Sequence, residues 1–135
     1  MNGVSTKAER PVRVLVVDDD PQMRSALERL LRLRGLETDS AFDGQDAVER
    51  LAVAAFDVVL CDVNMPRMGG PELLDHVVGS RLSCQVILMT GLQDLRSAVG
   101  AMRRGAFGLI AKPFASHQEV LVQVLDAARV NRLRE

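Results

Sequence analysis

Five polar side chains that can bind cations or phosphates stand at or just after the ends of apolar runs. They are the carboxylates of Asp18, Asp19 and Asp62, the hydroxyl of Thr90 and the ammonium of Lys112. Three carboxylates brought together would repel one another, by about 4 kcal/mol per pair at about 4 Å and an effective dielectric constant of about 20. Such a cluster would therefore protonate or bind a cation.

Oxygen ligands without histidine or cysteine favour Mg²⁺, Mn²⁺ or Ca²⁺ over zinc. Mg²⁺ is the expected cofactor, with Mn²⁺ as a substitute, because Mg²⁺ held by few carboxylates keeps positions open for phosphate oxygens. Lys112 and Thr90 would supply a point charge and a hydrogen-bond donor to a phosphoryl group. Since an aspartate can be the nucleophile in phosphoryl transfer, the pattern indicates a phosphoryl-binding site with a carboxylate acceptor.

Lysine is nearly absent from the chain. Of the 17 basic residues, only Lys7 and Lys112 are lysines. Lys7 falls in a polar N-terminal tail, so Lys112 is the single lysine expected in the folded part. Because a compact ammonium and a planar guanidinium are not interchangeable at a tight site, this usage marks Lys112 as a functional candidate.

The elements that must position these residues alternate along the chain. Short β-branched or apolar runs predict five strands, at about 12–17, 36–41, 58–61, 86–89 and 106–111. Helical spacing predicts five helices, from Pro21 to a stop near Gly35, at 45–54, through Leu73 to Val77, at 94–104 and from Ser116 onward. Asp20 is the expected N-cap of the first helix, and Ser116 with Glu119 forms a capping box at the last.

Two of these helices carry specific burial predictions. The helix at 94–104 should present an apolar face made of Leu95, Ala98, Val99 and Met102. The last helix should bury Leu121, Val122, Leu125 and Ala128. Cys61 and Cys84 lie in or beside apolar runs and should be small buried hydrophobes, while His76 and His117 should lie at the surface.

Five alternations of strand and helix predict an α/β fold, a doubly wound five-stranded parallel sheet with helices on both faces. The flavodoxin-like strand order 2-1-3-4-5 is the natural choice at this length. In such a sheet the carboxyl ends of all strands lie at one edge, and ligands bind where the order reverses, between strands 1 and 3. The five polar residues should therefore meet there.

Composition limits the class of protein. The chain has 135 residues, 47% of them hydrophobic, which suits one domain: a polar tail at 1–10, the domain at 11–131, and a charged helix end at 132–135 that could begin a linker. A net charge of −1 argues against direct nucleic-acid binding. With no apolar stretch long enough for a signal peptide or membrane span, we expect a cytoplasmic protein that does not bind membranes.

The motifs together resemble the receiver-domain signature of the response regulators of bacterial two-component signalling. The resemblance covers about 12–130. It rests on four motifs in order, Asp18-Asp19, the segment from Asp62 to Gly70, Thr90-Gly91, and the segment from Gly105 to Phe114 with Lys112-Pro113 near its end.

The resemblance implies a role for each site residue. Asp62 would be the phosphoacceptor, Asp19 a direct metal ligand and Asp18 a ligand through water. Asn64 would lend its backbone carbonyl to the metal, and Thr90 and Lys112 would contact the phosphoryl group. Lys112-Pro113 is similar to a cis peptide of the family. The implied donor is a histidine kinase or phosphotransfer protein, and the implied output is a C-terminal effector domain, a separate partner or a phosphorylation-dependent dimer.

Two other functions fit parts of the pattern. A degenerate receiver used only as a binding module would be expected to lose an acid or the lysine, and all are present. A haloacid-dehalogenase-like phosphatase would carry a second acid where this chain has Asn64, which cannot act as a general acid. We therefore expect a signalling phosphoacceptor, self-catalysed in phosphorylation and dephosphorylation, and not an enzyme.

One position departs from the family pattern. Receivers usually carry Tyr or Phe three residues before the lysine, where this chain has Leu109. Phe107 lies two residues earlier and, by strand alternation, should share the face of Leu109. Leucine fills less volume than an aromatic ring and has no hydroxyl, so we expect a signal that passes by repacking around strand 5 and the helix at 94–104.

Overall fold

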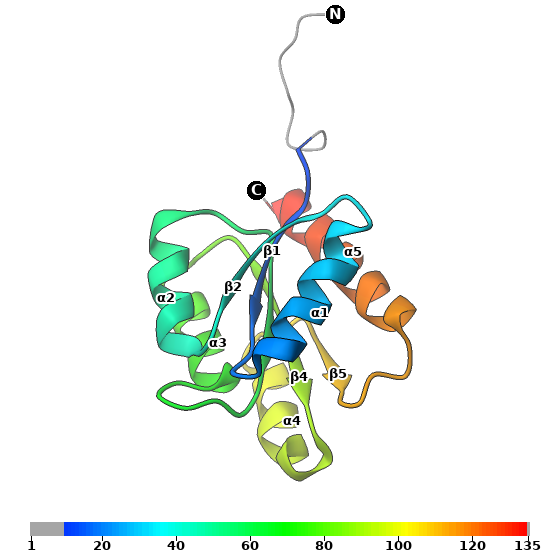
Figure 1. The fold of residues 1–135 in the computed structure, drawn as a ribbon. Coiled ribbons are helices and arrows are strands. Elements are labelled where there is room, and N and C mark those ends of the chain that lie inside the picture. The colour runs from blue at the N-terminus through cyan, green and yellow to red at the C-terminus, as the bar shows by residue number, and fades with distance from the viewer. Residues whose placement is uncertain (1–9, 135) are drawn as a thin grey trace, which may run out of the picture.

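The computed structural model describes residues 10–134, which alternate between strand and helix from end to end (Figure 1). The strands are β1 (Arg13–Val17), β2 (Glu37–Ala41), β3 (Val58–Asp62), β4 (Gln85–Thr90) and β5 (Gly108–Ala111). The helices are α1 (Pro21–Arg32), α2 (Gly44–Val53), α3 (Gly70–Gly79), α4 (Leu95–Arg103) and α5 (His117–Arg134), with a 3₁₀ turn, η2 (Leu92–Asp94), before α4. The polar tail expected at 1–10 falls outside the described residues except for Arg10.

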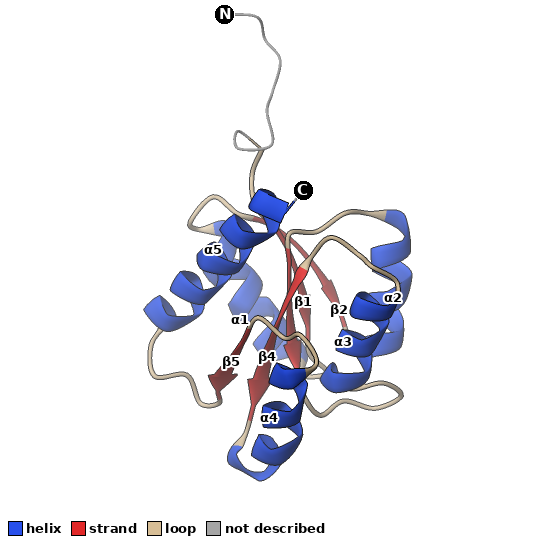
Figure 2. Ribbon diagram, turned by 180° about the vertical axis from the view of Figure 1, so that it is seen from behind, coloured by secondary structure: helices blue, strands red, loops and turns tan. Residues whose placement is uncertain are grey.

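The five strands form one parallel sheet in the order β2-β1-β3-β4-β5, as predicted. Its arrowheads all point to the same edge (Figure 2). In the register of the sheet, Val17 of β1 pairs with Cys61 of β3, so the residues that follow β1 lie beside Asp62. Thr90 of β4 pairs with Ala111 of β5, which brings Lys112 to the same edge.

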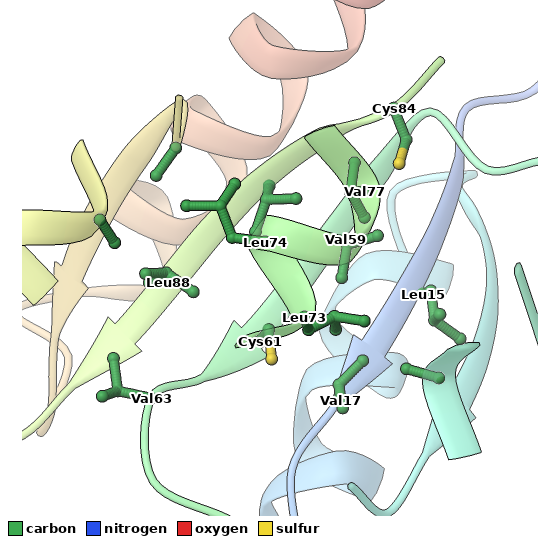
Figure 3. Close-up of a cluster of buried hydrophobic side chains, with 14 of the residues drawn as sticks. Leu15, Val17, Val59, Cys61, Val63, Leu73, Leu74, Val77, Cys84 and Leu88 are labelled. Atoms are coloured by element: carbon green, nitrogen blue, oxygen red, sulfur yellow. The ribbon is translucent and has the colours of Figure 1, made fainter. Parts of the chain in front are cut away.

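The two faces of the sheet carry separate apolar cores. Helices α1 and α5 pack on one face, and α2, α3 and α4 pack on the other (Figures 1 and 2). Figure 3 shows the second core, where Leu73, Leu74 and Val77 of α3 lie over side chains of β1, β3 and β4. Cys61 and Cys84 are buried free thiols in this core, as expected.

Helix caps fix the loops at the sheet edge. The side chain of Asp20 accepts a hydrogen bond from the N–H of Gln22, confirming the predicted N-cap of α1. Ser116 accepts from the N–H of Glu119 in the same way before α5. Gly35, with φ +84°, follows α1 in a left-handed conformation that suits glycine.

The burial predicted for α5 was wrong in part. Val122 and Leu125 are 46% and 47% exposed. The residues that α5 buries share a different face, and they are Val120, Leu121, Val124, Ala127, Ala128 and Asn131. The reason is that α5 is apolar on several sides, so that spacing alone did not select the inward face.

Helix α4 also buries less than predicted. Only its alanines, Ala98 and Ala101, are buried. Leu95, Val99 and Met102 are between 40% and 48% exposed. Small residues let α4 approach the sheet closely, and its larger apolar side chains remain in contact with solvent.

The last strand starts later than predicted, at Gly108 instead of 106. Phe107 therefore precedes the strand and packs against the core under α1 and α5, while Leu109 packs against the opposite core. The prediction that the two side chains share a face was wrong, because alternation applies only within a strand. No helix among residues 10–134 is long and apolar enough to cross a membrane.

Candidate functional site

Three carboxylates converge at the carboxyl edge of the sheet. Asp18 and Asp19 follow β1 directly and Asp62 ends β3, and one carboxylate oxygen from each lies within 4.8 Å of the others. Their environments differ, because Asp18 is 1% exposed, Asp62 is partly buried and Asp19 is exposed. The sequence prediction that these acids meet at the point of strand-order reversal is confirmed by this geometry.

The loop after β1 holds Asp18 in place. Its Oδ1 accepts a hydrogen bond from the N–H of Asp20 at 3.0 Å, and its backbone N–H donates to the carbonyl of Ala41. The guanidinium of Arg24, one turn into α1, donates to the carbonyl of Asp18 at 2.7 Å. The start of α1 and the end of β1 thus fix this carboxylate.

Lys112 follows β5, the strand at one end of the sheet, and its side chain extends to the acid cluster. Its Nζ lies 2.8 Å from Oδ2 of Asp18 and 3.0 Å from Oδ1 of Asp62. The backbone N–H of Lys112 donates to the carbonyl of Thr90, and the peptide bond to Pro113 is cis. Burial lowers the pKa of Lys112, but the hydrogen bonds to both aspartates outweigh burial and the net pKa is raised. The side chain therefore remains an ammonium.

The surroundings of Asp62 disfavour the charged form of its carboxyl. Burial raises the pKa of its carboxyl, the Lys112 ammonium opposes that effect, and the charges of Asp18 and Asp19 add to it. The net pKa is raised. One ammonium thus faces three carboxylates, and the cluster keeps an excess of negative charge that a divalent cation would offset.

Thr90 and Asn64 flank this cluster. The buried hydroxyl of Thr90, at the end of β4, donates to the carbonyl of Gly91 at 2.9 Å. Asn64 is exposed and lies two residues beyond β3 in the loop that leads to α3. That loop is tied down at its start, because the N–H of Val63 donates to the carbonyl of Met89.

Sequence reasoning missed one charged pair at the same edge of the sheet. The guanidinium of Arg67, in the loop between β3 and α3, donates to both carboxylate oxygens of Asp43, at 2.6 and 3.2 Å. Asp43 is the N-cap of α2. Its position just before a helix predicts a cap, but no sequence signal links it to an arginine 24 residues away.

The donor set fits the expected cation. The three acids offer only oxygen ligands, and two of them are accessible to solvent. Hard cations such as Mg²⁺ and Mn²⁺ prefer such ligands. The same cluster contains an ammonium and lies close to a buried hydroxyl, which are groups that bind phosphoryl oxygens.

Comparison with known proteins assigns the family. Residues 14–126 match the family model of the response regulator receiver domain. This chain belongs to that family. The receiver domain is 42% identical over 101 residues to the DNA-binding transcriptional regulator NtrC of Escherichia coli, a match that covers 75% of this chain and 22% of NtrC. It is 38% identical over 121 residues to the C4-dicarboxylate transport transcriptional regulatory protein DctD of Pseudomonas aeruginosa, covering 90% of this chain and 26% of DctD.

Solved structures agree with the fold. A receiver domain from Clostridium thermocellum superposes with a TM-score of 0.85 at 27% identity, covering 92% of this chain and 99% of that one. NtrX from Brucella abortus gives a TM-score of 0.85 at 29% identity, covering 93% of this chain and 29% of NtrX. The receiver domain thus spans about a quarter of the length of NtrC and DctD.

Proposed function

We propose that this receiver domain is a cytoplasmic phosphoacceptor in which Asp62 takes a phosphoryl group from a phosphohistidine of a histidine kinase or phosphotransfer protein. The observation that carries the proposal is the convergence of Asp62, Asp18, Asp19 and Lys112 at one edge of the sheet. Family membership supports a signalling role over a metabolic one.

In the proposed transfer, a carboxylate oxygen of Asp62 forms a bond to phosphorus while the bond from phosphorus to the donor imidazole nitrogen breaks. The imidazole leaves with that electron pair and takes up a proton, and Asp62 becomes an acyl phosphate. Lys112, which already donates to Asp62 at 3.0 Å, would turn to a phosphoryl oxygen. The hydroxyl of Thr90 would leave the carbonyl of Gly91 and donate to another.

The acids would hold the cation that the transfer requires. Asp19 and Asp62 would be direct carboxylate ligands, Asp18 would act through water, and Asn64 would offer its backbone carbonyl. Mg²⁺, or Mn²⁺ in its place, would neutralise the negative charge that the phosphoryl oxygens bring to the acids. This arrangement supports self-catalysed phosphorylation and dephosphorylation without a separate active site.

The conformational change that follows phosphorylation would reach a partner through the surface of α4, β5 and α5. Leu95, Val99 and Met102 on α4 are large apolar side chains in contact with solvent, a surface that suits a protein partner. NtrC is a DNA-binding transcriptional regulator, and on that likeness we propose control of an effector domain or partner in transcription. A dimer formed on phosphorylation is one form that this control could take.

The test is phosphorylation of the chain by acetyl phosphate in the presence of Mg²⁺, followed by intact mass. One phosphoryl group should add to the wild type and none to Asp62→Asn. Asp20→Asn is the matched control, because it removes a neighbouring carboxylate that caps α1 and lies outside the acid cluster. Equal labelling of wild type and Asp62→Asn would show that the acceptor lies elsewhere, and absence of labelling in the wild type would leave a binding module as the function.

A further inference from the structure

The pair of Asp43 and Arg67 lies outside the acid cluster and joins two loops at the same edge of the sheet. The side chain of Asp43 is 3% exposed and that of Arg67 is 54% exposed. Two parallel N–H donors of one guanidinium meet two oxygens of one carboxylate, a geometry that fixes orientation as well as distance. The ring of Phe42 adds a contact, with its centroid 5.7 Å from Cζ of Arg67.

Asp43 is itself held rigidly. Its Oδ1 accepts a hydrogen bond from the N–H of Asp46 at 2.8 Å, as the N-cap of α2. The hydrogen bond from Arg67 is the main reason that the pKa of this carboxyl is lowered. Because the carboxylate of Asp43 is buried and fixed at the start of α2, it holds the guanidinium of Arg67 in a fixed position.

The backbone of the same loop also contacts α2. The N–H of Gly44 donates to the carbonyl of Met68 at 2.8 Å. A Cβ on Gly44 would lie 2.5 Å from that carbonyl oxygen, so the close approach requires glycine. The loop after β3 therefore rests directly on the first turn of α2, with Arg67 and Met68 as its two points of attachment.

Arg67 adopts a backbone conformation that arginine rarely takes. Its φ is +67°, in the left-handed region that favours glycine. Local propensity therefore opposes an arginine here, and the bidentate pair with Asp43 is the interaction that offsets the strain. Strained backbone conformations cluster at functional sites, so an arginine at positive φ in this loop indicates a functional role for its side chain.

We infer that Arg67, held by Asp43, is a positioning residue for the cation site. This inference rests on the proposed function, since its target is the backbone carbonyl of Asn64. Asn64 and Arg67 lie three residues apart in the loop that begins at Val63, whose N–H is tied to Met89. The tie at Met89 fixes the start of the loop and the Asp43–Arg67 pair fixes its far side. Together they hold the Asn64 carbonyl where it can complement the three carboxylates.

Two variants separate positioning from general stability. Arg67→Met removes the ion pair and keeps the strained backbone. It leaves the buried carboxylate of Asp43 without the guanidinium that pairs with it. Arg67→Gly removes the pair and relieves the strain, so it should fold at least as well as Arg67→Met. Arg32→Met is the matched control, because Arg32 forms an ion pair of 2.9 Å with Glu28 on α1, away from both loops.

The measurement is Mg²⁺ affinity of the full 135-residue chain by titration calorimetry, since the chain has no Trp or Tyr for intrinsic fluorescence. Both Arg67 variants should bind Mg²⁺ about tenfold more weakly than wild type, the loss typical of a group that orients a metal ligand. Their phosphorylation rates should fall at low Mg²⁺ and recover at saturating Mg²⁺. Arg32→Met should match wild type in both.

The outcomes distinguish this inference from the proposed function. In one outcome, wild type binds Mg²⁺ and is labelled on Asp62, but Arg67→Gly binds Mg²⁺ with unchanged affinity. The Asp43–Arg67 pair then only attaches the loop to α2, and the positioning role is overturned. If wild type neither binds Mg²⁺ nor is labelled, the proposed function fails, and the inference fails with it. Weaker Mg²⁺ binding in both Arg67 variants, with recovery at saturation, supports the inference.

Discussion

The ammonium of Lys112 lies 3.0 Å from a carboxylate oxygen of Asp62, a residue 50 positions earlier in the chain. The same ammonium reaches Asp18 at 2.8 Å, so that one compact cation spans the gap between the ends of β1 and β3. The only other lysine of the chain is Lys7, which lies outside the described residues. The one lysine among residues 10–134 thus lies where a small charge fits between two acids.

Lys112→Arg should damage the site although it keeps the charge. A planar guanidinium is bulkier than an ammonium and cannot fit between Asp18 and Asp62 and then approach a phosphoryl oxygen in the same way. We expect phosphorylation by acetyl phosphate to fall by about tenfold or more, a modest part of what loss of one charge-stabilising donor costs. Intact mass against time measures this rate. An unchanged rate would mean that Lys112 takes no part in phosphorylation.

Mg²⁺ should raise the melting temperature of the wild type. A ligand that binds only the folded state stabilises it by about 2.7 kcal/mol at a concentration about 100 times its Kd. Asp19→Asn should reduce this shift, because Asp19 is the proposed direct ligand. Asp20→Asn keeps a good N-cap, so it should lower the melting temperature only slightly, through the lost negative charge at the start of α1, and leave the shift in place. A larger loss of the Mg²⁺ shift from Asp20→Asn would contradict the assignment of ligands.

Asp62→Asn should stabilise the metal-free protein at neutral pH. Because the folded-state pKa of Asp62 is raised, mainly by burial, the group stabilises the fold when protonated, below its unfolded pKa of about 3.9. That contribution is lost as pH rises through the folded-state pKa. Chemical denaturation in EDTA should show the variant more stable than wild type at pH 7, with the difference shrinking as pH falls. A variant less stable than wild type at pH 7 would show that the hydrogen bond from Lys112 stabilises the charged Asp62 by more than burial destabilises it.

Asp43 should have the opposite pH dependence. Its folded-state pKa is lowered, chiefly by the hydrogen bond from Arg67, so its charge stabilises the fold above the unfolded pKa of about 3.9 and that contribution is lost as pH falls through the folded-state pKa. Asp43→Asn keeps a good N-cap. The stability gap between wild type and this variant should be constant from about pH 7 to 5 and narrow below about pH 4. A gap that widens in acid would refute this sign.

Sequence patterns located the strands and the acid cluster well because both depend on local rules. A β-branched run that ends in Asp62 indicates a strand end whatever the rest of the chain does, and parallel strands then bring such ends to one edge. Contacts set by tertiary packing were not accessible in this way. The pair of Asp43 and Arg67 depends on how two loops meet, and the exposed faces of Val122 and Leu125 depend on which side of α5 the sheet selects.

The final prediction concerns Leu109, which stands where relatives of the family usually carry an aromatic ring. Leu109 is partly buried against the core beneath α4, and its carbonyl accepts a hydrogen bond from the side chain of Gln123 on α5 at 2.9 Å. A Cβ on Gly108, the residue before it, would meet the side-chain amide of Gln123, which would then have to move. Strand β5 is therefore coupled to α4 through the side chain of Leu109, and to α5 through its backbone and the buried side chain of Ile110.

Amide NMR spectra with and without beryllofluoride, a phosphoryl mimic, should reveal this coupling. We expect shifts that spread from Asp62 and Thr90 through residues 94–112 and onto Gln123. Leu109→Ala should shorten the spread into α4 and keep the shifts around Asp62, because a modification moves a conformational equilibrium only by the packing difference between its states. Gln123→Ala should weaken the shifts in α5 and leave those in α4 unchanged, because Ile110 still packs against α5. If shifts in the wild type stop at Asp62 and Thr90, the signal does not leave through α4 and β5, and Leu109 is then a packing residue with no part in the switch.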